Sequence, residues 1–86
     1  VLDVRANGWP MGSVIKTGEP VAVKVRARGT DVVKRIVLVG PEGTLASAEG
    51  AHSYLELEAH VYAAFFYARI EQVDGEMAWS SPIFLE

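Results

Sequence analysis

Alternation of apolar and polar residues with a period of two restricts the fold of this chain more than any other sequence feature. From Val21 to Arg28 every second residue is apolar (VAVKVRAR), and the segment Ser53–Val61 (SYLELEAHV) repeats the pattern. A strand turns alternate side chains to opposite faces, whereas a helix needs a period of 3.6. Both segments therefore predict half-buried strands, with core-facing residues Val21, Val23, Val25, Ala27, Leu55, Leu57, Ala59 and Val61.

Five further segments have strand composition and are separated by Gly, Pro and Asp at intervals of about ten residues. They are Leu2–Ala6, Val33–Val39, Thr44–Ala48 (an expected edge strand), Ala64–Val73 and Ile83–Leu85, and Ser13–Lys16 could extend the first of them. The Asp74-Gly75 pair is a strong hairpin signal before the last strand. Seven short antiparallel strands in one domain, residues 1–86, predict an all-β immunoglobulin-like or fibronectin III-like β-sandwich.

Two consequences of that topology concern side chains. In such a sandwich the strands 21–28 and 53–61 are neighbours, which places Lys24, Arg26 and Arg28 beside Glu56 and Glu58. In the strand 64–73, the side chains divide into a core face and an opposite face. The core face carries Phe66, Ala68 and Ile70, and the opposite face carries Phe65, Tyr67, Arg69 and Glu71. Aromatic residues on both faces indicate a central strand with its outer face partly covered.

Composition narrows the classes of partner. The net charge is −3, which argues against nucleic acid or an anionic membrane surface as a partner, because both require a basic face. No apolar run approaches the ~20 residues of a membrane span. The absence of cysteine is compatible with a cytosolic location and does not exclude secretion. Because the chain begins at Val1 and not at methionine, we expect it to be the C-terminal piece of a longer protein.

One segment carries a family resemblance. Tyr67, Arg69 and Ile70 form a Tyr-x-Arg-hydrophobic motif, and an Ala-Trp-Ser-x-Pro-Ile motif follows at residues 78–83. This segment resembles the C-terminal domain of bacterial PHP-type metal-dependent phosphoesterase-like proteins of the CehA/McbA group. The motif covers about a quarter of the chain, and the remainder agrees in pattern only.

The resemblance implies a role and a partner. In that family a catalytic domain rich in histidine and aspartate binds divalent metals, and the β-sandwich is an accessory module that follows it in the sequence. The metal ligands belong to the catalytic domain, so no catalytic, cofactor-binding or metal-binding residue is assigned to this chain. The expected partner is the catalytic domain of the same polypeptide, and self-association is an open alternative.

Candidate metal and serine sites are weak. His52 and His60 would lie about 27 Å apart on one extended segment, too far to bind one ion. Ser80 and Ser81 lack a neighbouring base, and we interpret them as turn residues before Pro82. The sequence therefore predicts no catalytic group in this chain.

The candidate contact residues are Trp9, Trp79 and Arg69, because exposed aromatic and arginine side chains anchor interfaces. For Trp79 we favour a structural role, covering the end of the core, while for Trp9 structural and binding roles are both open. The Arg69 stem is expected to be buried while its head stays in water, near Glu71 or a neighbouring strand. Two other functions stay open: a carbohydrate-binding or adhesive module in which a tryptophan stacks on a sugar, and an independent enzyme.

Overall fold

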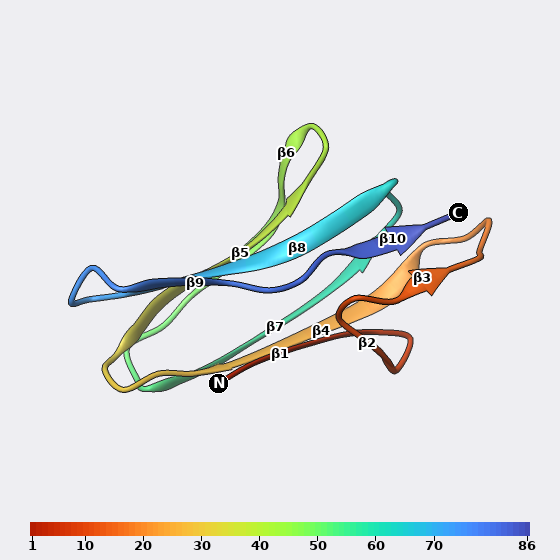
Figure 1. Cartoon of the computed structure of the whole chain (residues 1–86). Helices are drawn as coiled ribbons and strands as arrows, with labels where there is room; N and C mark the ends of the chain where they lie inside the picture. The colour runs from red at the N-terminus through yellow and green to blue at the C-terminus, as the bar shows by residue number, and fades with distance from the viewer.

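The computed structural model describes all residues from Val1 to Glu86 and consists of strands and connecting loops, without a helix (Figure 1). The strands are β1 Leu2–Ala6, β2 Trp9–Pro10, β3 Val14–Ile15, β4 Val21–Arg28, β5 Val33–Gly40, β6 Gly43–Glu49, β7 Tyr54–Val61, β8 Phe65–Gln72, β9 Met77–Trp79 and β10 Ile83–Leu85. No helix is therefore available that could cross a membrane.

The strands form two open sheets. One has the order β2-β1-β4-β7, and the other has the order β3-β10-β8-β5-β6, with β9 also paired to β8. All neighbours are antiparallel except β3 and β10, which are parallel. Figure 1 shows the first sheet below the second, with the β5–β6 hairpin projecting beyond the rest of the second sheet.

A single apolar core lies between the two sheets. Its residues come from the inner faces of both, and no polar or charged side chain is buried. The first sheet contributes Val4, Ala6, Val21, Val23, Val25, Ala27, Leu57 and Val61, and the second contributes Ile15, Val33, Ile36, Leu38, Phe66, Ala68, Ile70 and Ile83. The core faces that the sequence predicted for β4 and β8 are confirmed, and the predicted core face of β7 is buried or half-buried.

The chain has ten strand segments where the sequence predicted seven. The predicted extension of the first strand is a separate strand, β3, which pairs with β10. Two short strands were missed, β2 and β9. Strand β2 exists because Asn7 and Gly8 take positive φ angles of 48° and 86°, as a tight hairpin turn requires, so that Trp9 returns opposite Ala6. The Asn-Gly pair was a readable hairpin signal that we interpreted only as a strand end.

The last strand is divided into β9 and β10 by a bulge. Trp79 lies opposite Arg69 and Ile83 opposite Phe66, so residues 80–82 face only residues 67–68 of β8. Ser80 satisfies both backbone groups of Ala68 at this point. The Ser80 amide donates a hydrogen bond to the Ala68 carbonyl over 2.8 Å, and the Ser80 Oγ accepts one from the Ala68 amide over 2.9 Å. Ser80 thus bonds to the backbone through its side chain, as turn chemistry would require, but it lies in a bulge between two strands and not in the predicted turn.

Replacing Ser80 by alanine should destabilise the domain by about 1–3 kcal/mol, because the partly buried Ala68 amide would lose its acceptor. Urea unfolding followed by circular dichroism measures the loss. The matched control is Ser81→Ala, which removes an exposed hydroxyl and should change the free energy of unfolding by less than about 0.5 kcal/mol. Equal losses in the two variants would contradict the assignment.

Candidate functional site

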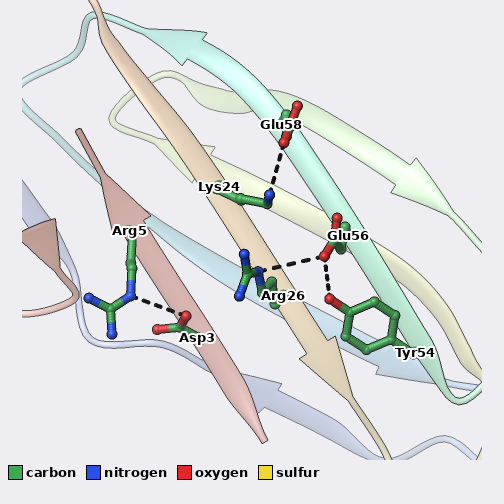
Figure 2. Close-up of polar contacts among 7 residues, drawn as sticks. All are labelled: Asp3, Arg5, Lys24, Arg26, Tyr54, Glu56 and Glu58. Atoms are coloured by element: carbon green, nitrogen blue, oxygen red, sulfur yellow. Dashed lines mark hydrogen bonds and ion pairs between the residues drawn. The ribbon is translucent and has the colours of Figure 1, made fainter. Parts of the chain in front are cut away.

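The outer faces of the two sheets differ sharply in chemistry. The first sheet carries a charged outer face, which we call the ion-paired face, formed by Asp3 and Arg5 of β1, Lys24, Arg26 and Arg28 of β4, and Tyr54, Glu56 and Glu58 of β7 (Figure 2). The Lys24 ammonium lies 3.3 Å from Glu58, and the Arg26 guanidinium 3.6 Å from Glu56. These are the charge pairs predicted from the sequence, and they confirm that the two strands are neighbours.

One bond on the ion-paired face shifts two pKa values. The Tyr54 hydroxyl donates to Glu56 Oε1. This bond, helped by the charges of Lys24 and Arg26, holds the pKa of Glu56 below its ordinary value, while the same bond raises the pKa of Tyr54. The Glu56 contribution to stability is therefore present above about pH 4.5 and is lost as the pH falls through its lower folded pKa. The Tyr54 contribution is present below pH 10.0 and is lost as the pH rises through its higher folded pKa.

Replacing Tyr54 by phenylalanine should raise the pKa of Glu56 toward its ordinary value, because the hydroxyl is the main cause of the depression. Titration of the Glu56 side-chain carboxyl by NMR measures the change. Tyr62→Phe, which alters another exposed tyrosine outside β7, is the control and should leave the Glu56 titration as it is. A Glu56 pKa that is unchanged in Tyr54→Phe would show that the lysine and arginine charges alone produce the shift.

The second sheet presents an outer face on which aromatic and apolar side chains adjoin the charged groups of Arg69, Glu71 and Arg35. Cross-strand pairing places Trp79 opposite Arg69, Met77 opposite Glu71, Phe84 opposite Phe65, and Val39 opposite Tyr67. Because cross-strand partners share a face, these side chains lie together on the side of the sheet away from the core. We call this surface the aromatic face and define it by Val14, Val39, Phe65, Tyr67, Arg69, Met77, Trp79 and Phe84.

Trp79 is the most exposed aromatic residue of the aromatic face, at 59%. The predicted role of covering the end of the core is wrong, because Ala78 occupies the inward position opposite Ile70 and turns Trp79 outward. The neighbouring aromatic side chains, Phe65 and Tyr67, are half-buried by the sheet itself. Trp79 therefore projects outward beside Arg69 on an edge strand of the sheet.

Arg69 lies beside Trp79 on the central strand of this sheet. The Arg69 guanidinium pairs with Glu71, with 3.6 Å between Nη2 and Oε2. Glu71 also pairs with Arg35 over 4.0 Å, and Arg35 pairs with Glu49 over 3.5 Å. The expected partner Glu71 and the half-buried stem are both found. The Nε atom, however, is buried without a hydrogen-bond partner. A buried unsatisfied donor lowers stability, which offsets part of what the ion pair with Glu71 contributes.

Trp9 lies in the other sheet, in β2, and is 60% exposed. Its position opposite Ala6 at the edge of the first sheet separates it from the aromatic face. The three candidate residues thus do not form one site: the structure brings Trp79 and Arg69 together and places Trp9 apart from them.

The sequence analysis missed Met77, Phe84 and Val14 as members of the aromatic face. Phe84 alternates with the inward residues Ile83 and Leu85, and this period of two was a usable signal. Val14 lies on the aromatic face only because β3 pairs with β10, and no local sequence pattern predicts this pairing.

Other candidate groups stand apart. His52 lies in an exposed loop and His60 on the exposed side of β7. No three His, Cys, Asp or Glu side chains lie close enough together to hold a metal ion. Ser80 and Ser81 lie in the bulge, and the Ser80 hydroxyl is engaged with the backbone of Ala68 and Ser81.

Comparison of the chain with family models, with curated proteins and with solved structures finds no match. The function is therefore argued from the two outer faces themselves.

Proposed function

We propose that this chain is a non-catalytic accessory domain that docks through its aromatic face onto the metal-dependent, PHP-type phosphoesterase domain of its own polypeptide. The supporting observation is the direct pairing of exposed Trp79 with Arg69 on the aromatic face of the second sheet. Tryptophan, tyrosine and arginine dominate the binding energy of protein interfaces, and interface cores are enriched in aromatic residues and methionine.

The motif shared with the phosphoesterase-like family supports the choice of partner. Several of its residues have structural explanations: Ile70, Ala78 and Ile83 face the core, and Ser80 bonds to the backbone across the bulge. Stability offers no comparable reason for the exposed indole of Trp79, and the partly exposed ion pair of Arg69 with Glu71 contributes only about 0–1 kcal/mol. In this proposal these two side chains are the docking contacts that the motif carries.

The same proposal includes an immunoglobulin-like or fibronectin III-like sandwich. In this interpretation the short strands β2 and β3 are counted with the first strand, β1. Strands β9 and β10 are counted as one strand interrupted by the bulge, which gives seven principal strands. A first sheet of β1, β4 and β7 against a second sheet of β6, β5, β8 and the final strand agrees with such a connectivity. In this frame the aromatic face is the outer surface of the larger sheet.

The test is a titration of the isolated 86-residue domain with the separately expressed catalytic domain of the same polypeptide, measured by calorimetry. Saturable binding that shifts the NMR signals of Trp79 and its neighbours supports docking. Absence of binding at millimolar concentration would refute it. Sedimentation of the isolated domain over a concentration range shows whether a second copy occupies the face instead.

A second candidate is a carbohydrate-binding module, which the exposed Trp79 indole beside the polar groups of Arg69 and Glu71 favours. A panel of glycans added to the domain distinguishes the two, because stacking of a sugar on Trp79 quenches tryptophan fluorescence saturably. Tryptophan fluorescence that no glycan changes, together with binding of the catalytic domain, would favour the docking function. Turnover of a phosphoester by the isolated domain with added divalent metals would contradict both candidates.

A further inference from the structure

Strand β7 ends its sheet with a long and regular free edge. Its eight residues pair with β4 in one continuous register, and no strand is hydrogen-bonded to its other side, although part of β6 comes within 8 Å of it, measured between Cα atoms. The edge of the second sheet differs, because β6 pairs with β5 through a register shift near Leu38 and Val39. A straight edge without a bulge or proline is the geometry to which another strand can be added.

Hydrogen bonds of β4 show which backbone groups of β7 are free. The Ala22 carbonyl accepts the Asn7 amide over 2.9 Å, and the Arg28 amide donates to the Val1 carbonyl over 2.8 Å, so the even-numbered residues of β4 point to β1. In an antiparallel ladder the groups of successive residues point to opposite sides. The odd-numbered residues of β4 therefore bond to the odd-numbered residues of β7.

The even-numbered residues of β7 consequently turn their amides and carbonyls to solvent. These residues are Tyr54, Glu56, Glu58 and His60. Their side chains lie on the exposed outer side of the sheet, with Glu56 and Glu58 on the ion-paired face (Figure 2). On the core side, Leu55 and Ala59 are only half-buried, whereas their partners Ala27 and Val23 on β4 are buried. A strand added at this edge would gain backbone bonds and would cover the exposed part of these two residues.

Charge excludes a second copy of β7 as the occupant. In a twofold antiparallel pair with matching faces, the central registers set Glu56 opposite Glu56, Glu56 opposite Glu58, or Glu58 opposite Glu58. Like charges directly opposite each other are unfavourable. The pattern on the other side of β7 is the complementary one, because β4 offers Lys24 and Arg26 to the same glutamates with valine between them.

We propose that the free edge of β7 binds an extended segment of alternating basic and apolar residues by antiparallel strand addition. The basic side chains of the segment lie opposite Glu56 and Glu58, whose carboxylates are accessible, with side chains 40% and 70% exposed. The apolar side chains lie over Leu55 and Ala59. Lys24 and Arg26 belong to the next strand inward, about 10 Å from the added strand, where salt screens their repulsion. This site is on the opposite sheet from the aromatic face and does not depend on the docking function.

The test uses a synthetic peptide of alternating valine and lysine, titrated into the ¹⁵N-labelled 86-residue domain. The amides of Tyr54, Glu56, Glu58 and His60 are expected to shift and to become protected from hydrogen exchange, while those of Leu55 and Leu57 are protected from the start. A peptide with glutamate in place of lysine is expected not to bind.

Glu58→Lys should weaken the binding of the lysine peptide about five- to tenfold, because an attraction is replaced by a repulsion at one cross-strand pair. Glu42→Lys, in the exposed turn between β5 and β6, changes the net charge equally and should leave the affinity as it is. If Glu58→Lys does not fold, Glu58→Gln gives the smaller loss. Shifts located on β6 or the aromatic face, equal binding of the acidic peptide, equal effects of the two charge changes, or no shift at millimolar peptide would each overturn the proposal.

Discussion

Replacing Phe66 by alanine is expected to unfold much of the domain at 37 °C. Phe66 is fully buried in β8, faces the core between the two sheets, and lies opposite the equally buried Ile83. Truncation of a buried phenylalanine to alanine costs about 3–5 kcal/mol, through lost apolar burial and the cavity left behind. A domain of 86 residues has a total stability of roughly 4–13 kcal/mol. The loss is therefore a large part of the whole.

Urea unfolding followed by tryptophan fluorescence measures the effect, and the matched control is Phe84→Ala. Phe84 is 43% exposed on the aromatic face, where its ring lies 6.2 Å from that of Phe65. Loss of such an aromatic pair costs about 0.5–1.5 kcal/mol. If Phe66→Ala cost no more than Phe84→Ala, the face assignment of β8 would be wrong.

Replacing Trp79 by alanine is expected to weaken docking to the catalytic domain at least about 30-fold, the effect of losing one dominant interface residue of about 2 kcal/mol. The reason is its place, exposed on the aromatic face and opposite Arg69. The stability of the isolated domain should change by only about 0.5 kcal/mol, because little of the indole area is buried. Calorimetric titration of the variant with the catalytic domain measures the first effect, and urea unfolding measures the second.

Trp9→Ala is the matched control for this substitution. Trp9 has nearly the same exposure, 60% against 59%, and lies in a short strand of the other sheet. Its removal should leave the affinity within about twofold. Similar losses from Trp9→Ala and Trp79→Ala would contradict docking through the aromatic face. Arg69→Met, which keeps an unbranched stem and removes the charged head, should give an intermediate loss of affinity and a loss of stability of no more than about 1 kcal/mol, because only a partly exposed ion pair with Glu71 is removed.

The two outer faces suggest a division of roles within one small domain. The aromatic face offers an apolar surface suited to a folded partner, whereas the free edge of β7 offers backbone groups and carboxylates suited to an extended basic segment. The Phe66, Trp79 and Glu58 variants act on the core, the aromatic face and the free edge respectively. The Glu58 effect can be separated from the other two because Glu58 lies in the other sheet. Phe66 and Trp79 lie in the paired strands β8 and β9 but on opposite faces, so unfolding and docking measurements on each variant distinguish their effects.

The sequence by itself determined the strands β4, β7 and β8 and their inner faces. Side chains along a strand alternate between the two faces of the sheet, so the face of each residue can be predicted from its neighbours in the sequence. The charge pairs between Lys24 or Arg26 and Glu58 or Glu56 were also predictable, once the two strands were taken as neighbours.

Only the tertiary structure decided the composition of the aromatic face. Val14 lies in a strand of two residues, too short to show a period, and reaches the face only by pairing with Phe84 near the other end of the chain. The bulge at residues 80–82 also shifts the register between Trp79 and Ile83, which alternation alone does not foresee. The exposure of both tryptophans was likewise decided by the assembled sheets, because it depends on whether a further strand covers a short edge strand, which local pattern does not set.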